Sequence, residues 1–258
     1  MGETVTYPQF TKNGRIGNQF FQAAATIAYG LDNGKDFIFP VEWEYNKYML
    51  KPLPYGIIFP TMHYIEPNFH YAPIPKLDGS VALDGFFQSP LYFQHRKTDI
   101  LPYFTLADKY HHYILLKYAK WLNGNTCSIH VRHGDYFNRG TNEYHGVLPI
   151  SYYEDAVREI YGCDDRDDLL FVICSDGISW CRDNFKFKNM LFIEGEEDVI
   201  DLFIMSYCMN HIIANSAFSW WSAWLGKNPE RKVVAPKKWF ANAPHDPKDI
   251  YCKDWIVI

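Results

Sequence analysis

The sequence predicts an α/β protein whose C-terminal half is a Rossmann-like parallel sheet. Short apolar runs of strand length alternate in that half with segments that carry apolar residues at helical spacing. Polar turns follow several of these runs directly. Such an alternation is typical of βα units, in which helices cover both faces of a parallel sheet. The length of 258 residues allows one large domain or two small lobes.

The N-terminal half starts with a strand, a tight loop and a helix, and then becomes irregular. The predicted strands cover residues 5–10, 37–41 and 81–87, and the predicted helices cover residues 20–29, ending at Gly30, and 110–122. Between residues 40 and 102 the chain is rich in Pro, Tyr, Phe and His and shows little other periodicity. An Asn-Gly-Asn turn at residues 123–125 is the predicted boundary, which gives domains of residues 1–124 and 125–258.

The C-terminal half is regular throughout. The predicted strands cover residues 126–131, 169–174, 190–193, 211–214 and 232–235, and the predicted helices cover residues 152–161, 178–185, 198–209 and 218–225. In an open parallel sheet the loops that follow the strands face the ligand crevice. The polar turns of this half are therefore the first candidates for a functional site.

Composition excludes several classes of protein. A formal net charge of −5 gives no basic field for nucleic acid, so we expect no nucleic-acid partner. The sequence contains neither 18 consecutive apolar residues nor a basic region followed by an apolar core at its N-terminus, and we expect a soluble intracellular protein. The six cysteines form no Cys-x-x-Cys pair, which favours buried thiols over a zinc site or a disulfide framework.

The turn after the strand of residues 126–131 carries the strongest candidate for an anion-binding group. Arg132 follows this strand at once, and His133, Gly134 and Asp135 come next. An arginine offers a planar fork of donors that matches phosphate or carboxylate oxygens, so Arg132 is a candidate anion clamp. A structural Arg-Asp ion pair that fixes the loop explains this stretch equally well.

Two further turns of this half are polar. Ser175 and Asp176 follow a strand and could hold a ribose hydroxyl, although ordinary turn and N-cap chemistry is the favoured interpretation. Asn215, Ser216 and Ser219 converge on a helix N-terminus. That position suits a phosphate, and two competing N-caps are the alternative.

Two candidates lie outside these turns. Gly14 and Gly17 let the backbone of a strand-to-helix loop approach a ligand closely, although Gly-x-x-Gly is also an ordinary βα turn. Asp201 stands in the first turn of an otherwise apolar helix. It offsets the helix dipole, or, if buried, it could accept the paired donors of a purine edge.

Four segments taken together resemble the inverting α-1,2-fucosyltransferases in order and spacing. They are Gly-Arg-Ile-Gly-Asn-Gln-Phe-Phe-Gln at residues 14–22, His-Val-Arg and Gly-Asp-Tyr within residues 130–136, residues 171–176, and Ile-Ile-Ala-Asn-Ser-Ala-Phe-Ser-Trp-Trp-Ser-Ala-Trp-Leu at residues 212–225. The last string is long and unusual, and generic core packing does not readily supply it. Only residues 43–120 have no match, and an acceptor pocket could vary there.

The resemblance implies a fold and an activity. The fold is a two-lobed glycosyltransferase fold of the B type, in which residues 125–258 would bind GDP-L-fucose in a Rossmann-like lobe and residues 1–124 would form the acceptor-side lobe. The family transfers L-fucose with inversion onto a sugar hydroxyl, here the 2-hydroxyl of a terminal galactoside in a glycan. It requires no metal and no cofactor, since GDP-L-fucose is the donor substrate.

The resemblance also assigns roles to the candidate residues. Arg132 would bind the pyrophosphate of the donor and neutralise the departing GDP, with His130 close by. Asn18 would approach the fucose and the phosphate, and Asp201 would recognise the guanine. The phosphate site would be lined by Asn215, Ser216 and Ser219.

The sequence departs from the family pattern at His133, where most members carry the second arginine of His-x-Arg-Arg. One donor is lost there or depends on pH. We expect Arg132 to be indispensable and His133 to change activity only in degree. A base that removes the proton of the acceptor hydroxyl is expected at Asp135 or Glu143, with His145 as a third candidate.

Other interpretations remain open at this level. The chain could transfer fucose in another linkage or to a protein hydroxyl, because the acceptor pocket sets the linkage. It could also be a non-catalytic nucleotide-sugar-binding or glycan-binding protein, which the substitution at His133 supports. A Rossmann oxidoreductase is disfavoured because no Gly-x-Gly-x-x-Gly follows a strand. Without a Golgi anchor in the sequence, we expect a bacterial or viral enzyme of the cytoplasm, and the sequence defines no oligomeric state.

Overall fold

The computed structural model describes residues 2–133, 146–163 and 166–258. The three candidate bases Asp135, Glu143 and His145 lie outside the described residues. The chain divides into two compact units, an N-terminal unit of Met1–Lys109 with His245–Cys252 and a C-terminal unit of Tyr110–Pro244 with Lys253–Ile258. This division falls at the start of helix α3 (Asp108–Leu122), whereas the predicted boundary, after residue 124, follows the end of that helix.

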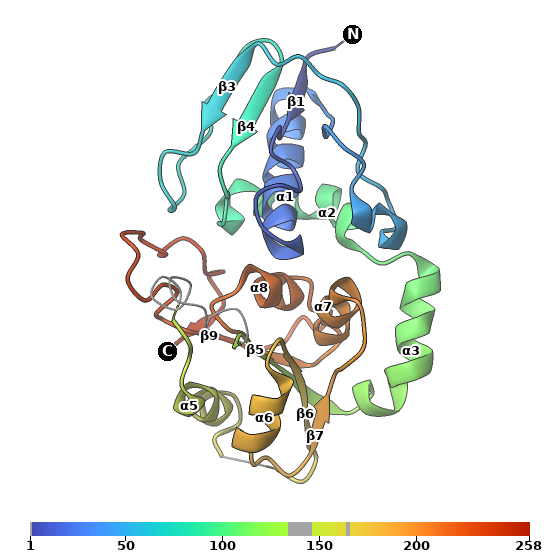
Figure 1. Cartoon of the computed structure of the whole chain (residues 1–258), viewed down its shortest axis with the longest axis vertical. Coiled ribbons are helices and arrows are strands. Elements are labelled where there is room, and N and C mark those ends of the chain that lie inside the picture. The colour runs from blue at the N-terminus through green and yellow to red at the C-terminus, as the bar shows by residue number, and fades with distance from the viewer. Residues whose placement is uncertain (1, 134–145, 164–165) are drawn as a thin grey trace. The chain divides into compact units, whose positions relative to one another are not determined.

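The N-terminal unit is built on a sheet of four parallel strands in the order β2-β1-β4-β3 (Figure 1). The strands are β1 (Thr4–Thr6), β2 (Asp36–Phe37), β3 (Met62–Ile65) and β4 (Val81–Asp84). Because every pair is parallel, the carboxyl ends of all four strands lie at one edge of the sheet. The chain passes from β1 to β2 on one side and places β3 and β4 on the other side of β1. The topological switch point, where such sheets bind ligands, therefore lies between β1 and β4.

Helix α1 (Ile16–Asn33) forms the centre of this unit and is buried along most of its length. It packs on β1 and β2 and also against residues 90–104. The ring centroids of Phe20 and Phe104 lie 4.7 Å apart, and those of Phe21 and Phe93 lie 5.9 Å apart. A helix that is apolar on all sides has to be covered in this way.

The predicted end of this helix at Gly30 is wrong, because α1 continues to Asn33 and ends at Gly34. Gly34 has a φ of +64°, the left-handed conformation that closes many helices. Gly30 serves packing instead. A Cβ atom at this position would lie 3.0 Å from the carbonyl oxygen of Lys35 and 3.1 Å from Cγ1 of Val5.

The irregular region of the N-terminal unit contains one strand that the sequence did not predict. Strand β3 pairs only with β4 at the edge of the sheet, and most of its side chains are exposed, so no alternation of apolar and polar residues marks it. The predicted strand over residues 37–41 is shorter, since only β2 pairs with β1 and Phe39 forms an isolated bridge to Tyr55. The remaining elements are short, namely η1 (Glu44–Tyr48), η2 (Pro90–Tyr92), η3 (Gln94–Arg96), α2 (Lys97–Ile100) and η4 (Leu101–Phe104).

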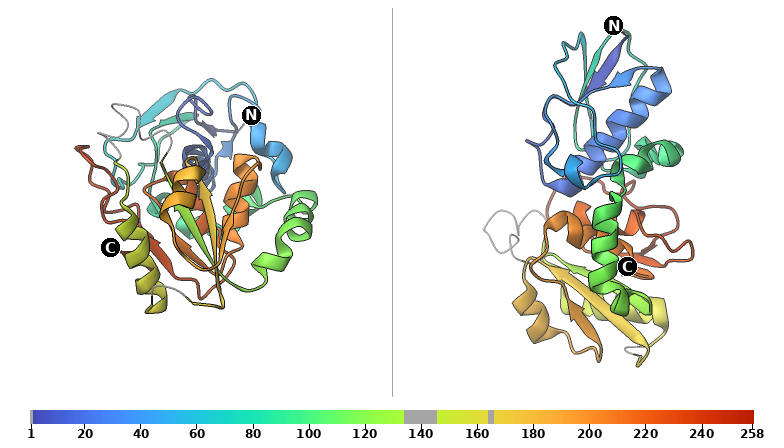
Figure 2. Two further views of the ribbon diagram at one scale, coloured as in Figure 1. Left: turned by 60° about the horizontal axis from the view of Figure 1, so that its bottom comes forward. Right: turned by 90° about the vertical axis from the view of Figure 1, so that its right-hand side faces the viewer.

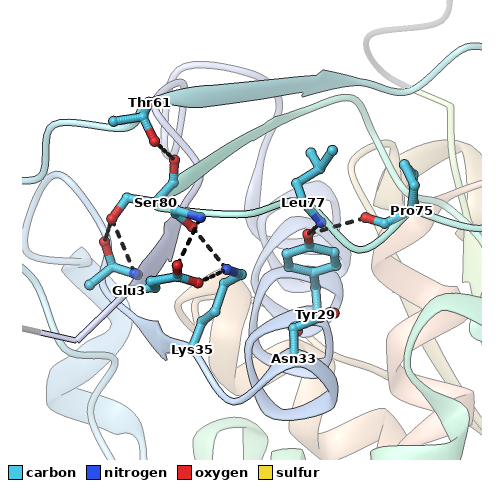
Figure 3. A network of polar contacts seen from close by, with 10 residues as sticks. Glu3, Tyr29, Asn33, Lys35, Thr61, Pro75, Leu77 and Ser80 are labelled. Atoms are coloured by element: carbon cyan, nitrogen blue, oxygen red, sulfur yellow. Dashed lines mark hydrogen bonds and ion pairs between the residues drawn. The ribbon is translucent and has the colours of Figure 1, made fainter.

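A polar network fixes the amino-terminal edge of this sheet (Figure 3). The buried ammonium group of Lys35 pairs with the carboxylate of Glu3 and donates to the carbonyl oxygen of Gly79 at 2.9 Å. The N–H of Gly79 donates to Oε1 of Glu3 at 2.9 Å. The hydroxyl of Tyr29 accepts from the N–H of Leu77 at 3.1 Å. The chain segments before β1 and β4 are thus tied together at the edge opposite to the carboxyl ends of the strands.

The C-terminal unit is a doubly wound sheet of six parallel strands in the order β10-β9-β8-β5-β6-β7 (Figures 1 and 2). The strands are β5 (Asn125–Val131), β6 (Leu169–Ser175), β7 (Met190–Phe192), β8 (Asn210–Ile212), β9 (Val233–Ala235) and β10 (Ile256–Val257). The chain runs outward from β5 to β7, returns to β8 beside β5 and then runs outward on the other side. The switch point of this unit therefore lies between β5 and β8.

Helices cover both faces of the C-terminal sheet. They are α5 (Ile150–Tyr161), α6 (Ile178–Asn184), α7 (Asp198–Ser206) and α8 (Ala217–Trp224). Cys127, Ile129 and Val131 of β5 point to one face and share a core cluster with α5 and α6. His130 points to the other face, where its ring meets that of Phe218 on α8. Every predicted strand and helix of this half is confirmed with ends that differ by a few residues, and β10 was not predicted.

Cysteine burial follows the prediction in part. Cys127, Cys174, Cys181 and Cys208 are buried free thiols, whereas Cys163 and Cys252 are partly exposed. Burial raises the pKa of the Cys181 thiol to about 11, so this sulfur is protonated at neutral pH. In the described part of the chain, no helix combines the length and the apolar character needed to span a bilayer.

Candidate active site

The register of β5 against β6 brings Arg132 next to Asp176. Val131 and Ser175 form the last pair of these two parallel strands, so the next residue of each strand leaves the sheet at the same point. Nη1 of Arg132 lies 2.7 Å from Oδ2 of Asp176, and the N–H of His133 donates to Oδ1 of Asp176 at 2.7 Å. An Arg-Asp ion pair therefore exists at this loop, and its aspartate comes from the neighbouring strand.

Ser175 and Asp176 both hold the β6 turn in shape. Oγ of Ser175 accepts from the N–H of Gly177 at 2.9 Å, as in ordinary turn chemistry. Both carboxylate oxygens of Asp176 bind the β5 loop. A Cβ atom at position 177 would lie 2.9 Å from Cβ of His133, which explains why this position is a glycine. The favoured turn chemistry is present, and contact with a ribose stays a prediction.

His133 lies flat against an indole. The ring centroids of His133 and Trp180 are 4.4 Å apart with an interplanar angle of 27°. Burial lowers the pKa of His133, and the nearby Asp176 only partly opposes this effect. The imidazole is therefore largely neutral at pH 7 and does not replace the charge of the second family arginine.

His130 is a buried neutral histidine at the switch point. Its side chain extends from β5 toward α8, and its ring centroid lies 5.3 Å from that of Phe218. Within the described residues, Nδ1 of His130 is buried and has no hydrogen-bond partner. Burial, together with the positive charge of Arg132, lowers the pKa of His130 to about 3. A ligand that brought a donor or acceptor to this edge could satisfy the unused nitrogen.

The N-terminus of α8 follows β8 on the other side of the switch point. Ser216 is the N-cap residue, and the described structure contains no side-chain hydrogen bond that caps the helix. The hydroxyl of Ser219 is fully buried and donates to the carbonyl oxygens of Ala214 at 3.4 Å and Ser216 at 3.3 Å. Nδ2 of Asn215 donates to the carbonyl oxygen of Trp239 at 3.1 Å. Ser219 and Asn215 thus shape the turn, and the first N–H groups of α8 are oriented for an anion.

Asp201 is a partly buried acid on the same face of the sheet as His130. It lies in the first turn of α7, and its Oδ1 atom is buried without a hydrogen-bond partner among the described residues. Burial raises the pKa of Asp201 to about 7, and the negative charges of Glu196 and Asp198 add to the shift. A helix-dipole role alone does not explain a buried oxygen without a donor. The unused buried oxygen is compatible with a carboxylate that accepts donors from a ligand, and this role stays a prediction.

In the N-terminal unit, Asn18 lies in the first turn of α1, directly after the loop that follows β1 at the switch point. Gly14 has a φ of +89°, and a Cβ atom there would lie 2.0 Å from Nδ2 of Asn18. Only glycine leaves room for this asparagine. Oδ1 of Asn18 accepts from Nε2 of Gln88 at 2.7 Å, and Gln88 belongs to the turn after β4. The two residues therefore join the first turn of α1 to the turn after β4.

The glutamines of the same motif hold the loop before α1 through side-chain hydrogen bonds to its carbonyl oxygens. Nε2 of Gln19 donates to the carbonyl oxygen of Gly14 at 3.2 Å, and Nε2 of Gln22 donates to that of Asn13 at 2.9 Å. Oε1 of Gln19 accepts from Nε1 of Trp43 at 2.7 Å. Gly17 is buried in the first turn of α1. The motif Gly-x-x-Gly-Asn-Gln thus encodes a rigid loop, and contact between its backbone and a ligand stays a prediction.

Three side chains that complete these edges were not predicted, namely Gln88, Trp180 and Phe218. Gln88 is a polar residue just after a predicted strand, the same signal that pointed to Arg132, and it could have been found in that way. Trp180 and Phe218 carry no such signal. Aromatic residues on a helix belong to the core in most proteins, and only the register of the strands brings these two to the histidines.

Solved structures share the two parallel α/β units. The α-1,6-fucosyltransferase NodZ co-crystallised with GDP matches with a TM-score of 0.57 at 12% identity, over 91% of this chain and 95% of that chain. The apo form of POFUT1 matches with a TM-score of 0.52 at 12% identity, over 91% and 97%. At such identities the likeness concerns the fold alone. The fold is that of B-type glycosyltransferases, and the predicted fold class is confirmed.

The family can be stated more closely. The model of glycosyl transferase family 11 matches residues 6–258, and the chain belongs to this family, so the predicted resemblance is confirmed. The O-antigen biosynthesis glycosyltransferase WbnK of Escherichia coli is 37% identical over 178 residues, which make up 64% of this chain and 57% of WbnK. The alpha-1,2-colitosyltransferase of Escherichia coli is 34% identical over 219 residues, or 78% of this chain and 72% of that protein. Galactoside alpha-(1,2)-fucosyltransferase 2 of Sus scrofa is 27% identical over 241 residues, or 82% and 67%.

Proposed function

We propose that this family 11 glycosyltransferase is an inverting α-1,2-fucosyltransferase that moves L-fucose from GDP-L-fucose to the 2-hydroxyl of a terminal galactoside. The observation that carries the proposal is the position of Arg132, held by Asp176 at the switch point of the C-terminal sheet. Family membership supports glycosyl transfer. The galactoside fucosyltransferase of Sus scrofa supports the donor sugar and the linkage.

The chemical task is to stabilise the leaving group. The sugar passes through a transition state with oxocarbenium character while negative charge gathers on the diphosphate. Arg132 after β5 and the first N–H groups of α8 after β8 would stabilise that charge without rearrangement, because Asp176 already fixes the arginine. Losing one such preorganised donor typically lowers turnover about a hundredfold to a thousandfold.

The neutral and acidic groups of the same unit would bind the rest of the donor. Neutral His130 would complete its hydrogen bonds with the ligand and adds no second charge beside Arg132. Asp201 would accept two donors of the guanine edge, a task for which an acid with an unused buried oxygen is suited. Asn18 would contact the fucose, as the family resemblance implies.

A second candidate is transfer of colitose in place of fucose. The alpha-1,2-colitosyltransferase of Escherichia coli is 34% identical, against 27% for the galactoside fucosyltransferase of Sus scrofa. Colitose is L-fucose without its 3-hydroxyl, so the two donors differ by one polar group. The site groups that act on the pyrophosphate and the guanine would serve both donors equally.

Product analysis tests the proposal. The protein is incubated with GDP-L-fucose or GDP-colitose and a terminal β-galactoside, and NMR assigns the new linkage. We expect an α-1,2-fucosylated galactoside. A colitosylated product alone would establish the second candidate, and another linkage would place the specificity elsewhere. A folded protein that binds GDP-L-fucose but transfers nothing to a broad acceptor panel would be a binding protein.

The proposed partners are GDP-L-fucose and a glycan acceptor, with no cofactor, no metal requirement and no nucleic acid. Independence of metal stays a prediction, which turnover in the presence of a chelator checks directly. Cytoplasmic location also stays a prediction of the sequence.

The matched part of WbnK is 57% of its length, so further parts of that protein have no counterpart in this comparison.

A further inference from the structure

A stacked pair of rings lies beside the ion pair of Arg132 and Asp176. The ring centroids of His133 and Trp180 are 4.4 Å apart, and the interplanar angle is 27°. His133 follows Arg132 in the turn after β5, and Trp180 lies on α6, which comes after the β6 turn. All four residues belong to the C-terminal unit. The family resemblance assigns no role to Trp180, and it compares His133 only with an arginine.

The indole of Trp180 is anchored in the core of this unit. Its ring meets that of Phe185 edge-on, with centroids 6.2 Å apart and an interplanar angle of 81°. Phe185 is buried, and its ring lies 5.5 Å from that of Tyr153 on α5. Trp180 itself is partly buried and packs against the core cluster of the sheet. Because tryptophan has only two side-chain torsions, packing of this kind makes the indole a rigid support.

The side chain of His133 also lies close to the β6 turn. A Cβ atom at position 177 would lie 2.9 Å from Cβ and 3.1 Å from Nδ1 of His133. Gly177 has a φ of −129°, which any residue can adopt, so the glycine at this position leaves room for the imidazole. The imidazole is therefore placed by two neighbours, the β6 turn and the indole on α6.

The backbone of His133 connects the stacked rings to the ion pair. Its N–H donates to Oδ1 of Asp176 at 2.7 Å, and Oδ2 of the same carboxylate lies 2.7 Å from Nη1 of Arg132. A carboxylate that is held at one oxygen presents the other oxygen in a fixed direction. The side chains of Arg132 and Asp176 are 19% and 24% exposed, so an anion from solvent can reach the guanidinium. The contacts thus run from the core through indole, imidazole and carboxylate to the guanidinium.

The imidazole of His133 is suited to support and not to charge. Burial lowers the pKa of His133, and Asp176 only partly opposes this effect, so the ring is largely neutral at pH 7. Stacking of two aromatic rings typically shifts an equilibrium by about threefold to tenfold. An arginine at this position could also stack on the indole through its planar guanidinium. A stacking role therefore fits the histidine of this chain and the arginine of the family pattern alike.

We propose that the stack of His133 on Trp180 holds Asp176, and through it Arg132, in the orientation that binds the pyrophosphate of the donor. His133 and Trp180 are positioning residues in this role, and neither has to touch the ligand. The inference rests on the proposed function, in which Arg132 binds the diphosphate. It differs from a direct role of His133, in which the imidazole would donate a hydrogen bond to a phosphate oxygen.

Substitutions of the two rings separate these roles. His133→Phe keeps a flat ring against the indole and removes both ring nitrogens, whereas His133→Ala removes the ring. We expect His133→Phe to bind GDP with wild-type affinity and His133→Ala to raise the Kd of GDP about threefold to tenfold. Trp180→Leu should raise the Kd by the same factor, and the double variant should bind no more weakly than either single variant. Calorimetric titration with GDP measures all four variants.

Binding of guanosine shows whether the effect passes through Arg132. Guanosine carries no phosphate, so its affinity, measured by NMR titration, should be equal in wild type, His133→Ala and Trp180→Leu. In an Arg132→Ala background, His133→Ala should have little further effect on the Kd of GDP. Equal weakening of guanosine and GDP would mean a general loosening of the unit and would contradict the inference.

Trp121→Leu is the matched control for Trp180→Leu. Trp121 is a partly buried tryptophan of α3 in the same unit, and its ring lies 6.0 Å from that of Tyr118. The control removes an indole of similar burial that has no part in the proposed contacts. It should bind GDP with wild-type affinity, and a loss equal to that of Trp180→Leu would show that the effect is not specific to the stack.

The outcomes are separable from those of the proposed function. A wild type that binds GDP and fucosylates a galactoside, together with a His133→Phe variant as weak as His133→Ala, would assign the imidazole a direct contact with the donor. That result would refute the inference and leave the proposed function intact, and so would additive losses in the double variant. If Trp180→Leu does not fold, the comparison of His133→Phe with His133→Ala still decides. A wild type that binds no GDP would defeat the proposed function and this inference together.

Discussion

Nη1 of Arg132 and Oδ2 of Asp176 lie 2.7 Å apart at the carboxyl ends of two neighbouring parallel strands. The contact follows from strand register, since the last paired residues directly precede them. The aspartate orients the guanidinium without burying it, because the side chain of Arg132 remains 19% exposed. An anion can therefore still reach the arginine, as the proposed role in donor binding requires.

The first prediction concerns the ion pair between Asp176 and Arg132. Asp176→Asn keeps the shape but places an uncharged amide beside Arg132, so the arginine should lose its fixed orientation. We expect the donor KM to rise and kcat/KM to fall about tenfold to a hundredfold, the usual worth of a hydrogen bond to a charged group. Steady-state kinetics with varied GDP-L-fucose measures this.

A double-mutant cycle sharpens the result. If Asp176 acts through Arg132, then Asp176→Asn should have little further effect in an Arg132→Ala background. Fully additive losses would mean that Asp176 contacts the donor by itself, as the sequence-based ribose hypothesis states.

The second prediction concerns His133. Burial lowers the pKa of His133 below the ordinary value, so the protonated form is a minor species above pH 7 and decreases further as pH rises. Donor affinity should therefore gain nothing from the charge of His133 between pH 7 and pH 8. We expect His133→Arg to change turnover by less than about tenfold, because one arginine at this edge already provides the main charge. Far higher turnover in this variant would show that the substitution at this position had weakened the enzyme.

The third prediction concerns Asp201. Since its pKa is raised to about 7, the ionised form that would accept donors from guanine grows as pH rises through that value. GDP should bind more tightly at pH 8 than at pH 6, and Asp201→Asn should bind weakly with no such dependence. Calorimetric titration at the two pH values measures both effects. Equal pH dependence in wild type and variant would remove Asp201 from the nucleotide site.

The same shift has a stability consequence with a definite sign. A raised pKa in the folded state means that the folded protein holds its proton better than the unfolded chain does. This contribution is fully present below the ordinary value of 3.8 and is lost as pH rises through about 7. Asp201→Asn carries no such charge, so without ligand it should melt at a higher temperature than wild type at pH 8. A lower melting temperature at that pH would contradict the burial argument.

The fourth prediction concerns Gly14. Gly14→Ala adds a Cβ atom 2.0 Å from Nδ2 of Asn18 and has to displace this side chain from Gln88. We expect transfer to fall at least tenfold. Gly34→Ala is the matched control, because Gly34 also has a positive φ but no atom within 4 Å of the added Cβ. The control should lose about 1 kcal/mol of unfolding free energy and keep its turnover. Equal activity of the two variants would show that Asn18 is not needed at its position.

Much of the fold was predictable because the C-terminal half follows simple rules. Its strands are continuous apolar runs between helices with a clear period, which fixes element type and order. The N-terminal unit obeys these rules less well. Strand β3 is an exposed edge strand without alternation, and Gly30 ended the predicted helix although its role is close packing against Val5 and Lys35. Helix-end rules treat a glycine as a stop, and the tertiary contact overrides them here.

The candidate residues could be named from the sequence one by one, but the contacts between them could not. A cation after an apolar run marks a strand end, which is how Arg132 stands out in the sequence, whereas the role of Asn18 was implied by the family resemblance. Their partners Asp176 and Gln88 depend on strand register and sheet order, which no local pattern encodes. Trp180 escaped notice for the same reason, since only the parallel pairing of β5 with β6 brings α6 to the turn after β5.

The most direct test of the central claim is acceptor-stimulated release of GDP from GDP-L-fucose by wild type and by Arg132→Ala. Arg166→Ala is the matched control, because Arg166 forms an exposed ion pair with Asp168 two residues away. We predict that a terminal β-galactoside stimulates release by wild type and by the control, and that Arg132→Ala loses about a hundredfold to a thousandfold of this rate while remaining folded. A folded Arg132→Ala variant that releases GDP at the wild-type rate would contradict the account.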